Sequence, residues 1–399
     1  MESTPQAIRS FRLRAHHLDT PLPGGAASLC EAAGACGVQN SPPGAWETAL
    51  FQRVAGCTLD GLHRALYREK SLLQAWSYRG VPVVFPTAES AVFLDPLCAL
   101  PGEEPWVYTR GITLGLDFLG LSFAELLPLV RQAARWLDGR TVVSKEALDR
   151  ALAALVAPQL PPDKRPLWEA PSMYGAPDRQ TVGGAMVSFL LRPCAFSSLV
   201  VFGERQGVSP TFTSFQSWTG QPPQPAPDAP QRLARKFLHC YGPTGPDALA
   251  AWLGCTPPQA KRLWNTVAAE VEPVQVAGRT RYLLAADHEA LRAAGPEGDR
   301  LLLLGPHDPY LDLRDRALLL PDPALQRLVW KTVGNPGAVL CGGRVIGLWT
   351  QKQQADRLAL TIRLWEPPDA ARQRTLTDRA EAYAAFRQCA LQSCTFQPL

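Results

Sequence analysis

The 399-residue sequence contains no run of about 18 apolar residues, and the N-terminal stretch MESTPQAIRSFRLRAHHL lacks the apolar segment of a signal peptide. We therefore expect a soluble, cytoplasmic protein that does not associate with a membrane. The stretch GPTGPD has neither the Gly-x-Gly-x-x-Gly nor the Gly-Lys-Ser pattern of a phosphate-binding loop, and no Gly-x-Ser-x-Gly motif occurs. These absences disfavour a nucleotide-binding loop and a Ser-His-Asp hydrolase.

Metal-binding motifs are also absent from the sequence. None of the ten cysteines has a partner at C-x2-C spacing, and the six histidines are scattered. His16 and His17 are the only adjacent pair, and neighbours on a helix point about 100° apart, which is poor geometry for sharing one metal. We expect buried free thiols, surface or groove-facing imidazoles at positions 16 and 17, and no metal or organic cofactor. A cysteine nucleophile such as Cys36 beside these histidines is the least favoured alternative.

The charge is nearly balanced, because 40 Lys and Arg face 36 Asp and Glu and leave a net charge of +4. No polybasic tail indicates nucleic-acid binding. Arg outnumbers Lys, which suits planar contacts to phosphate groups, but a GC-rich genome produces the same bias. Charge alone therefore does not identify a partner.

The chain is long enough, and with 46% hydrophobic residues apolar enough, to bury a core in two to four structural units. The clearest boundary is the Pro-rich stretch TGQPPQPAPDAPQ at residues 219–231. In the first block, apolar spacing predicts a helix over residues 59–66 and a second helix around residues 72–76, followed by a β-ribbon beginning at residues 81–84. This order is typical of a winged helix, in which the second helix enters a DNA groove.

The same order of helices and hairpin occurs twice more. In the second block Ser122 and Glu125 form a capping-box pattern at the start of a helix. The third block predicts helices over residues 232–241, 246–253 and 257–269 and a hairpin that turns at Ala277-Gly278. Residues 300–365 predict an antiparallel meander that turns at Gly342-Gly343, and the stretch DRAEAYAAFRQCALQ predicts a terminal helix.

We therefore predict an α+β protein with three tandem winged-helix units around a DNA-binding groove and a C-terminal antiparallel β region. The expected divisions are 1–112, 113–222, 223–295 and 296–399. The predicted partner is double-stranded DNA, and a monomer is expected.

Seven stretches, in order from about Arg12 to Trp365, together resemble a family of winged-helix DNA-binding proteins that includes the AlkZ-like DNA glycosylases, which unhook or excise alkylated bases. They are RLRAHHLD, GVQNSPPGAWETALFQRV, REKSLLQAWSYRGVPVVF, YGPTGPDALAAWLG, VAGRTRYLL, LLLLGPHDPYLDLRDRALLL and GAVLCGGRVIGLWTQKQQADRLALTIRLW.

The resemblance implies a catalytic tripeptide, Gln-x-Gln or Gln-x-Asp, in the DNA groove. Gln39 matches its first position, whereas Asn40 stands where the family usually has an apolar residue and Ser41 where the second Gln or Asp belongs. A Gln carbonyl can polarise a water below C1′ of the sugar, and a carboxylate can also stabilise the oxocarbenium-like transition state. Ser41 is shorter and carries no charge, and losing one charge-stabilising group costs about 10²–10³ in rate.

Two functions remain open at this point. One is a metal-independent glycosylase that holds its water with Gln39 and either Ser41 or Asn40. The other is a non-catalytic winged-helix DNA-binding protein, either a regulator or a lesion-recognition protein. Whether the protein is an enzyme is therefore undecided from the sequence.

Candidate DNA contacts lie beside the tripeptide and at the expected wings, although each is equally well read as a solvated charge. Arg12, Arg14 and His17 are assigned to the helix just before the tripeptide. Arg79 is assigned to the entrance of the first wing, and Arg279 and Arg281 are assigned to the hairpin of the third unit.

Other polar and aromatic residues near these motifs favour structural roles. Asp308, in a stretch that also holds Asp315 and Arg316, is expected to form an Asx turn and a local ion pair. Trp46 and Phe51 are expected in the core of a helix over residues 45–54 rather than as stacking platforms for bases.

Overall fold

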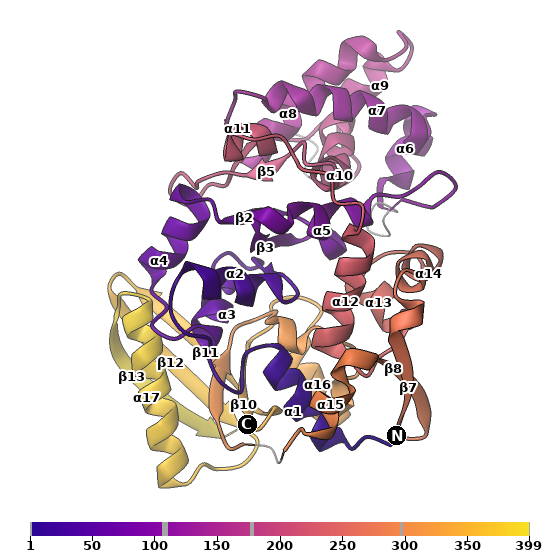
Figure 1. Cartoon of the computed structure of the whole chain (residues 1–399). Coiled ribbons are helices and arrows are strands. Elements are labelled where there is room, and N and C mark those ends of the chain that lie inside the picture. The colour runs from indigo at the N-terminus through magenta and orange to yellow at the C-terminus, as the bar shows by residue number, and fades with distance from the viewer. Residues whose placement is uncertain (1, 106–110, 176–178, 296–297, 399) are drawn as a thin grey trace.

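The computed structural model describes residues 2–105, 111–175, 179–295 and 298–398 (Figure 1). These described residues combine α-helices with four β-sheets, in agreement with the predicted mixture of α and β structure. The expected division between residues 295 and 296 adjoins residues 296–297, which lie outside the described residues.

The first segment (residues 26–86) forms a three-stranded antiparallel sheet in the order β1-β3-β2, covered by helices. Predicting a helix around residues 72–76 was wrong, because these residues form β2, with all five buried. The helix α1 (Pro5–Ala15) precedes this segment and α5 (Ser90–Leu94) follows it. The elements are α2 (Ala26–Gly34), β1 (Val38–Gln39), α3 (Ala45–Arg53), α4 (Leu59–His63) continued by the π-helical turn η1 (Arg64–Arg68), β2 (Leu72–Trp76) and β3 (Pro82–Pro86).

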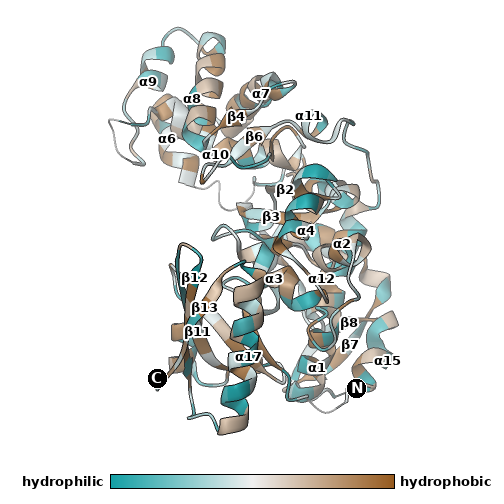
Figure 2. Cartoon of the chain, turned by 90° about the vertical axis from the view of Figure 1, so that its left-hand side faces the viewer, coloured by the Kyte–Doolittle hydropathy of each residue, from teal (hydrophilic) through white to brown (hydrophobic). Residues whose placement is uncertain are grey.

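The second segment keeps this order of helix, strand, two helices and two strands, but adds one helix before its first strand and one between its first and second strands. Its first strand again pairs with its third in the sheet β4-β6-β5. The capping box predicted at Ser122 and Glu125 is confirmed at the start of α7. In Figures 1 and 2 this segment forms a lobe at one end of the molecule. The elements are α6 (Thr113–Leu119), α7 (Phe123–Ala134), β4 (Val142–Val143), α8 (Lys145–Val156), α9 (Arg165–Glu169), α10 (Val182–Phe196), β5 (Val201–Phe202), β6 (Thr211–Thr213) and α11 (Phe215–Thr219).

The third segment shows the same order, with a single bridge between Thr244 and Tyr282 in place of the first strand. The hairpin predicted at Ala277-Gly278 is confirmed, as are the bounds 246–253 of the middle helix, which begins with Pro246. The elements are α12 (Ala229–Tyr241), α13 (Pro246–Leu253), α14 (Pro257–Asn265), β7 (Val271–Val276), β8 (Arg279–Leu284) and α15 (His288–Arg292).

The C-terminal part is a five-stranded sheet in the order β13-β12-β11-β10-β9, with α17 lying across one face (Figure 2). The meander β10-β11-β12 and its turn at Gly342-Gly343 are confirmed. The predicted terminal helix ends earlier, at Phe386, and the chain then forms β13, which runs parallel to β12. The elements are β9 (Leu301–Leu304), α16 (Pro323–Val329), β10 (Gly337–Cys341), β11 (Arg344–Gln354), β12 (Arg357–Leu364), α17 (Ala370–Phe386) and β13 (Ala390–Pro398).

Two hydrophobic cores meet at the first sheet. One contains Phe85 of β3 and continues into Phe237 of α12, so it joins the first segment to the third. The other contains Val84 of β3 and continues into Val339 and Leu360 of the five-stranded sheet. Because side chains alternate along β3, its two faces pack against different parts of the chain. The strand β1 pairs with β3 and so belongs to the sheet that lies between the two cores.

No single described helix is long and apolar enough to cross a membrane, although the bent pair Thr113–Leu119 and Phe123–Leu137 has a suitable length and composition.

Candidate active site

Gln39 ends the short strand β1, where its backbone pairs with Val83 of β3. Its side chain is 5% exposed. The amide nitrogen Nε2 donates to the carbonyl oxygen of Ser41 at 3.1 Å, and Oε1 accepts from Nη2 of Arg79 at 3.2 Å. Both ends of the amide are therefore held, which fixes the direction in which its oxygen points.

Arg79 connects three separate parts of the chain at this site. It lies in the turn between β2 and β3 with φ of 55°, a left-handed conformation that costs a non-glycine residue about 1–2 kcal/mol. Its Nη1 donates to the carbonyl oxygen of Trp252 in α13, and its Nη2 also donates to Oδ2 of Asp312 at 2.9 Å. A strained arginine with fixed partners is the kind of feature found at functional sites.

The carboxylate of Asp312 accepts from the same Arg79 nitrogen that contacts the Gln39 side chain. It is 10% exposed, and burial raises the pKa of its carboxyl to about 6 even though Arg79 acts to lower it. Burial and the charge of Arg79 also lower the pKa of nearby His307. The sequence prediction missed Asp312, although it weighed Asp308 and Asp315 on either side; only the fold shows which of these carboxylates faces Arg79.

Asn40 has both ends of its side chain occupied by protein partners. Its Nδ2 donates to Oε1 of Gln74 at 3.0 Å, and its Oδ1 accepts from the backbone N–H of Gly44 at 2.7 Å. Ser41 is half-buried and its carbonyl oxygen helps to hold Gln39. These contacts give Asn40 and Ser41 clear positioning roles, whereas their catalytic roles stay predictions.

A surface pocket of about 730 Å³ adjoins the tripeptide, with Asn40 in its wall. In it His63 Nε2 contacts Glu47 Oε1 at 2.9 Å, and Arg387 also pairs with Glu47. Although burial opposes ionisation of Glu47, these two partners lower its pKa. The basic residues of the wall come from the α4-η1 helix and from the β5-β6 turn, so the pocket lies between the first and second segments. They are His63, Arg64, Arg68 and Arg205.

The three residues assigned to the helix before the tripeptide lie elsewhere. Arg12 and Arg14 are on α1 and His17 follows it, whereas α2 is the helix that directly precedes Gln39. Arg12 is buried, donates to the carbonyl oxygens of Tyr241 and Gly242, and pairs with Asp315 at 2.8 Å. These contacts support a structural position for Arg12, and its role in DNA binding stays a prediction.

The remaining DNA-contact candidates are more accessible than Arg12. Arg14 is half exposed beside Asp19, and burial lowers the pKa of half-buried His17. Arg279 is exposed next to the tip of the β7-β8 hairpin, while Arg281 lies 3.5 Å from Asp247. Their contact with DNA also stays a prediction.

Asp308 forms a buried ion pair, but its partner is distant in sequence rather than local. Arg53 of α3 donates to both carboxylate oxygens, at 2.8 and 2.7 Å, and both side chains are at most 2% exposed. The Asx bond is confirmed, because Oδ1 accepts from the backbone N–H of Tyr310. Trp46 is buried in α3 as expected, and Phe51 stacks on Phe386. The Arg53–Asp308 ion pair therefore links α3 to the segment that contains Asp312.

The ten cysteines are free thiols, of which Cys36, Cys194, Cys240 and Cys255 are buried. The expectation of an accessible imidazole at His16 was wrong, since this side chain is 1% exposed and lies near two of the buried cysteines. Burial also leaves Cys36 poorly placed to act as a nucleophile on a macromolecule.

Comparison with known proteins agrees with this architecture. The family profile described as DNA glycosylase AlkZ-like matches residues 32–386. Among solved structures, DNA glycosylase AlkZ from Streptomyces sahachiroi shares the fold, with a TM-score of 0.75 over 100% of both chains at 21% sequence identity. No curated protein is significantly similar to the chain. The chain belongs to the AlkZ-like DNA glycosylase family, as its seven ordered stretches indicate.

Proposed function

We propose that this protein acts as a monomer on duplex DNA and hydrolyses the N-glycosidic bond of alkylated or crosslinked purines. The observation that carries the proposal is the placement of Gln39, whose amide is held in one orientation by Arg79 and Ser41 in a chain of the AlkZ-like family. The product would be an abasic site and the free modified base.

We also propose that the three repeated segments are winged helices within units 1–112, 113–222 and 223–295, followed by the C-terminal β region at 296–399. The repeated pairing of the first strand with the third supports this assignment. The wings would be the β2-β3, β5-β6 and β7-β8 hairpins, of which the last two carry the exposed residues Arg205 and Arg279. Basic groups on such hairpins suit contacts to phosphates.

The chemistry requires little acid catalysis. An alkylated purine carries positive charge, so the electron pair of the breaking C1′–N bond moves onto a base that leaves as a neutral molecule. A water molecule attacks C1′ and loses one proton to solvent. The free lone pair of Gln39 Oε1 can accept a hydrogen bond from that water, which orients it and places negative potential near the forming cation.

Arg79 and Asp312 would act on Gln39 as positioning residues. A bare guanidinium 3.2 Å from the Gln39 oxygen would oppose a positive charge forming on the sugar. The carboxylate of Asp312, 2.9 Å from the same guanidinium nitrogen, makes the pair neutral. In this proposal Asp312 removes the repulsion that Arg79 would exert on the forming cation, but it does not replace the carboxylate that Ser41 lacks.

The competing function is lesion recognition without chemistry. It is favoured by the low exposure of Gln39 and by Ser41 at the second motif position. One assay distinguishes the two functions. The protein is incubated with duplexes that contain 7-methylguanine, 3-methyladenine or an N7-linked crosslink, and abasic sites are then cleaved with alkali.

We expect strand cleavage with the wild-type protein, loss of cleavage in Gln39→Ala, and unchanged cleavage in Gln353→Ala, an exposed glutamine of β11. Ser41→Asp should raise the rate, because it restores a carboxylate at the second motif position. Salt-dependent DNA binding without product on any of the three lesions would refute the glycosylase proposal and leave the recognition function.

A further inference from the structure

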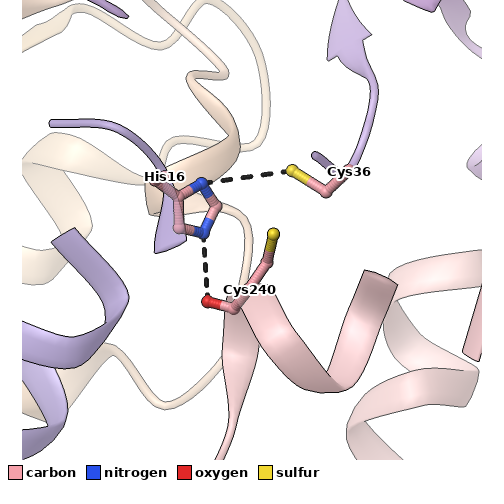
Figure 3. Close-up of side chains that lie close together, drawn as sticks. All are labelled: His16, Cys36 and Cys240. Atoms are coloured by element: carbon pink, nitrogen blue, oxygen red, sulfur yellow. Dashed lines mark hydrogen bonds between the residues drawn. The ribbon is translucent and has the colours of Figure 1, made fainter. Parts of the chain in front are cut away.

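Three potential metal ligands that come from separate parts of the sequence lie close together in the buried interior (Figure 3). His16 follows α1, Cys36 lies between α2 and β1, and Cys240 is in α12. Their side chains are 1%, 2% and 0% exposed, and their ligand atoms all lie within 4.8 Å of one another. The spacing of the ligands, 20 and 204 residues, explains why no short motif indicated a site.

The hydrogen bonds around His16 leave one ring nitrogen free to bind a metal. Nε2 lies 3.1 Å from the carbonyl oxygen of Cys240, which can only accept, so Nε2 carries the proton. Nδ1 then presents its lone pair to Cys36 Sγ at 4.0 Å (Figure 3). Metal-bound histidines almost always donate their other N–H in this way, often to a backbone carbonyl.

The sulfur of Cys36 also lies 3.7 Å from the hydroxyl of Tyr241. That hydroxyl donates its one proton to the carbonyl oxygen of Pro309 at 2.9 Å, so its oxygen is left to accept from the Cys36 thiol. Tyr241 itself is fixed in the core by neighbouring aromatic rings, including that of His16 at 5.1 Å.

We propose that His16 Nδ1, Cys36 Sγ and Cys240 Sγ bind Zn²⁺, with a water molecule in the fourth position. A set of two cysteines and one histidine is among the protein ligand sets that zinc takes. Zn–N of about 2.05 Å and Zn–S of about 2.3 Å in a tetrahedron separate N and S by about 3.6 Å. The observed 4.0 Å between His16 and Cys36 therefore needs to shorten by only about 0.4 Å.

The charge balance fits a buried site. Binding of Zn²⁺ releases two protons from the two thiols, and the two thiolates with neutral imidazole leave a centre of zero net charge. A neutral centre avoids the large cost of placing an isolated charge in an apolar core.

The site lies close to a surface pocket. The thiol of Cys240 contacts the carbonyl oxygens of Ala15 and Ala35, at 3.8 and 3.5 Å. Both alanines line a surface pocket of about 630 Å³, whose wall also contains His17 and His239. Cys240 thus lies next to residues that line an open pocket.

Zinc bound here would link the end of α1 and the helix α12 to Cys36, which lies three residues before Gln39. The site is distinct from the proposed hydrolysis, since no ligand belongs to the Gln39–Arg79–Asp312 contacts. Its expected effect is on folding and stability, and its test needs no glycosylase activity.

The test is metal analysis of the full-length protein, purified under reducing conditions from cells grown with added zinc and desalted before measurement. We expect about one zinc per chain, falling to about a tenth or less in Cys36→Ser, Cys240→Ser and His16→Gln. The matched control is Cys194→Ser, which removes a fully buried thiol of α10 and should keep its zinc.

If the variants fail to fold, measurements on the wild-type protein alone decide the question. Cobalt added to metal-free wild-type protein should give a thiolate-to-metal charge-transfer band, and a chelator should lower the melting temperature. Wild-type protein that purifies without zinc and shows no cobalt band would overturn the proposal. A disulfide between Cys36 and Cys240 under these reducing conditions, seen as a mass lower by two hydrogens, would overturn it equally.

Discussion

Asp312 predicts a specific dependence of glycosylase rate on pH. Its carboxyl has a pKa of about 6, raised by burial, and only its ionised form neutralises Arg79. For a group with this pKa, the ionised fraction is about 90% at pH 7 and about 10% at pH 5, so the rate should fall about tenfold between them. The sign follows from the charge, because protonation of Asp312 leaves Arg79 as a bare cation beside the forming oxocarbenium ion.

The assay is single-turnover excision of 7-methylguanine from a duplex, with spontaneous depurination at each pH subtracted. Asp312→Asn keeps an oxygen that can accept from Arg79 but removes the charge. We expect it to be slower by about tenfold or more at pH 7 and to lose the acid limb of the profile. Asp356→Asn, in the exposed turn between β11 and β12, should retain both rate and limb. An acid limb near pH 6 that survives in Asp312→Asn would refute this reasoning.

Three further predictions concern stability and DNA binding. Asp308→Asn leaves the buried Arg53 charge without its counter-ion and should lower the free energy of unfolding by about 3–5 kcal/mol, measured by urea denaturation; a loss below about 1 kcal/mol would contradict the buried pair. The hydrogen bond to Asp287 raises the pKa of His239, so this pair stabilises the fold at low pH and less as pH rises through the folded-state pKa. His239→Gln should therefore destabilise the protein more at about pH 5.5 than at about pH 8.5, and equal losses would argue against a charged pair. Arg279→Ala should reduce the slope of log affinity for duplex DNA against log salt by about 0.9, and an unchanged slope would remove Arg279 from the interface.

Local chemistry made much of the fold predictable. Pro246 at a helix start, the Ser122 capping box and the Ala277-Gly278 turn were recognised because each element carries its own boundary signals. The strand β2 was misread because all five of its residues are buried, so the alternation expected of a half-exposed strand is absent. Its apolar residues at 72, 73 and 76 imitate the spacing of a helix face.

The C-terminal strand could not be inferred from its own residues. Six of the nine residues of β13 are exposed and none is buried, and its pairing with β12 is a parallel contact made after the intervening helix α17. Parallel pairing depends on tertiary structure, whereas the apolar spacing through Tyr383 and Phe386 favoured a continued helix.

The candidate site was predictable only in part. Gln39, Asn40 and Ser41 were found through their order with other motifs, but the partners that position them are distant. Asp312 contacts Gln39 through Arg79, which precedes Asp312 by 233 residues of sequence. The spacing of residues in one sequence does not reveal such contacts, and for the same reason Cys240 was not recognised as a neighbour of His16 and Cys36.

The central claim is that Gln39 serves the hydrolysis of an N-glycosidic bond. The most direct measurement is the single-turnover excision rate of wild-type protein and Gln39→Ala on one alkylated duplex, at enzyme concentrations that saturate DNA binding. The proposal predicts that the variant binds DNA as tightly and excises the base about 10²–10³ times more slowly. Equal excision rates for the two proteins, or no excision by the wild type, would contradict it.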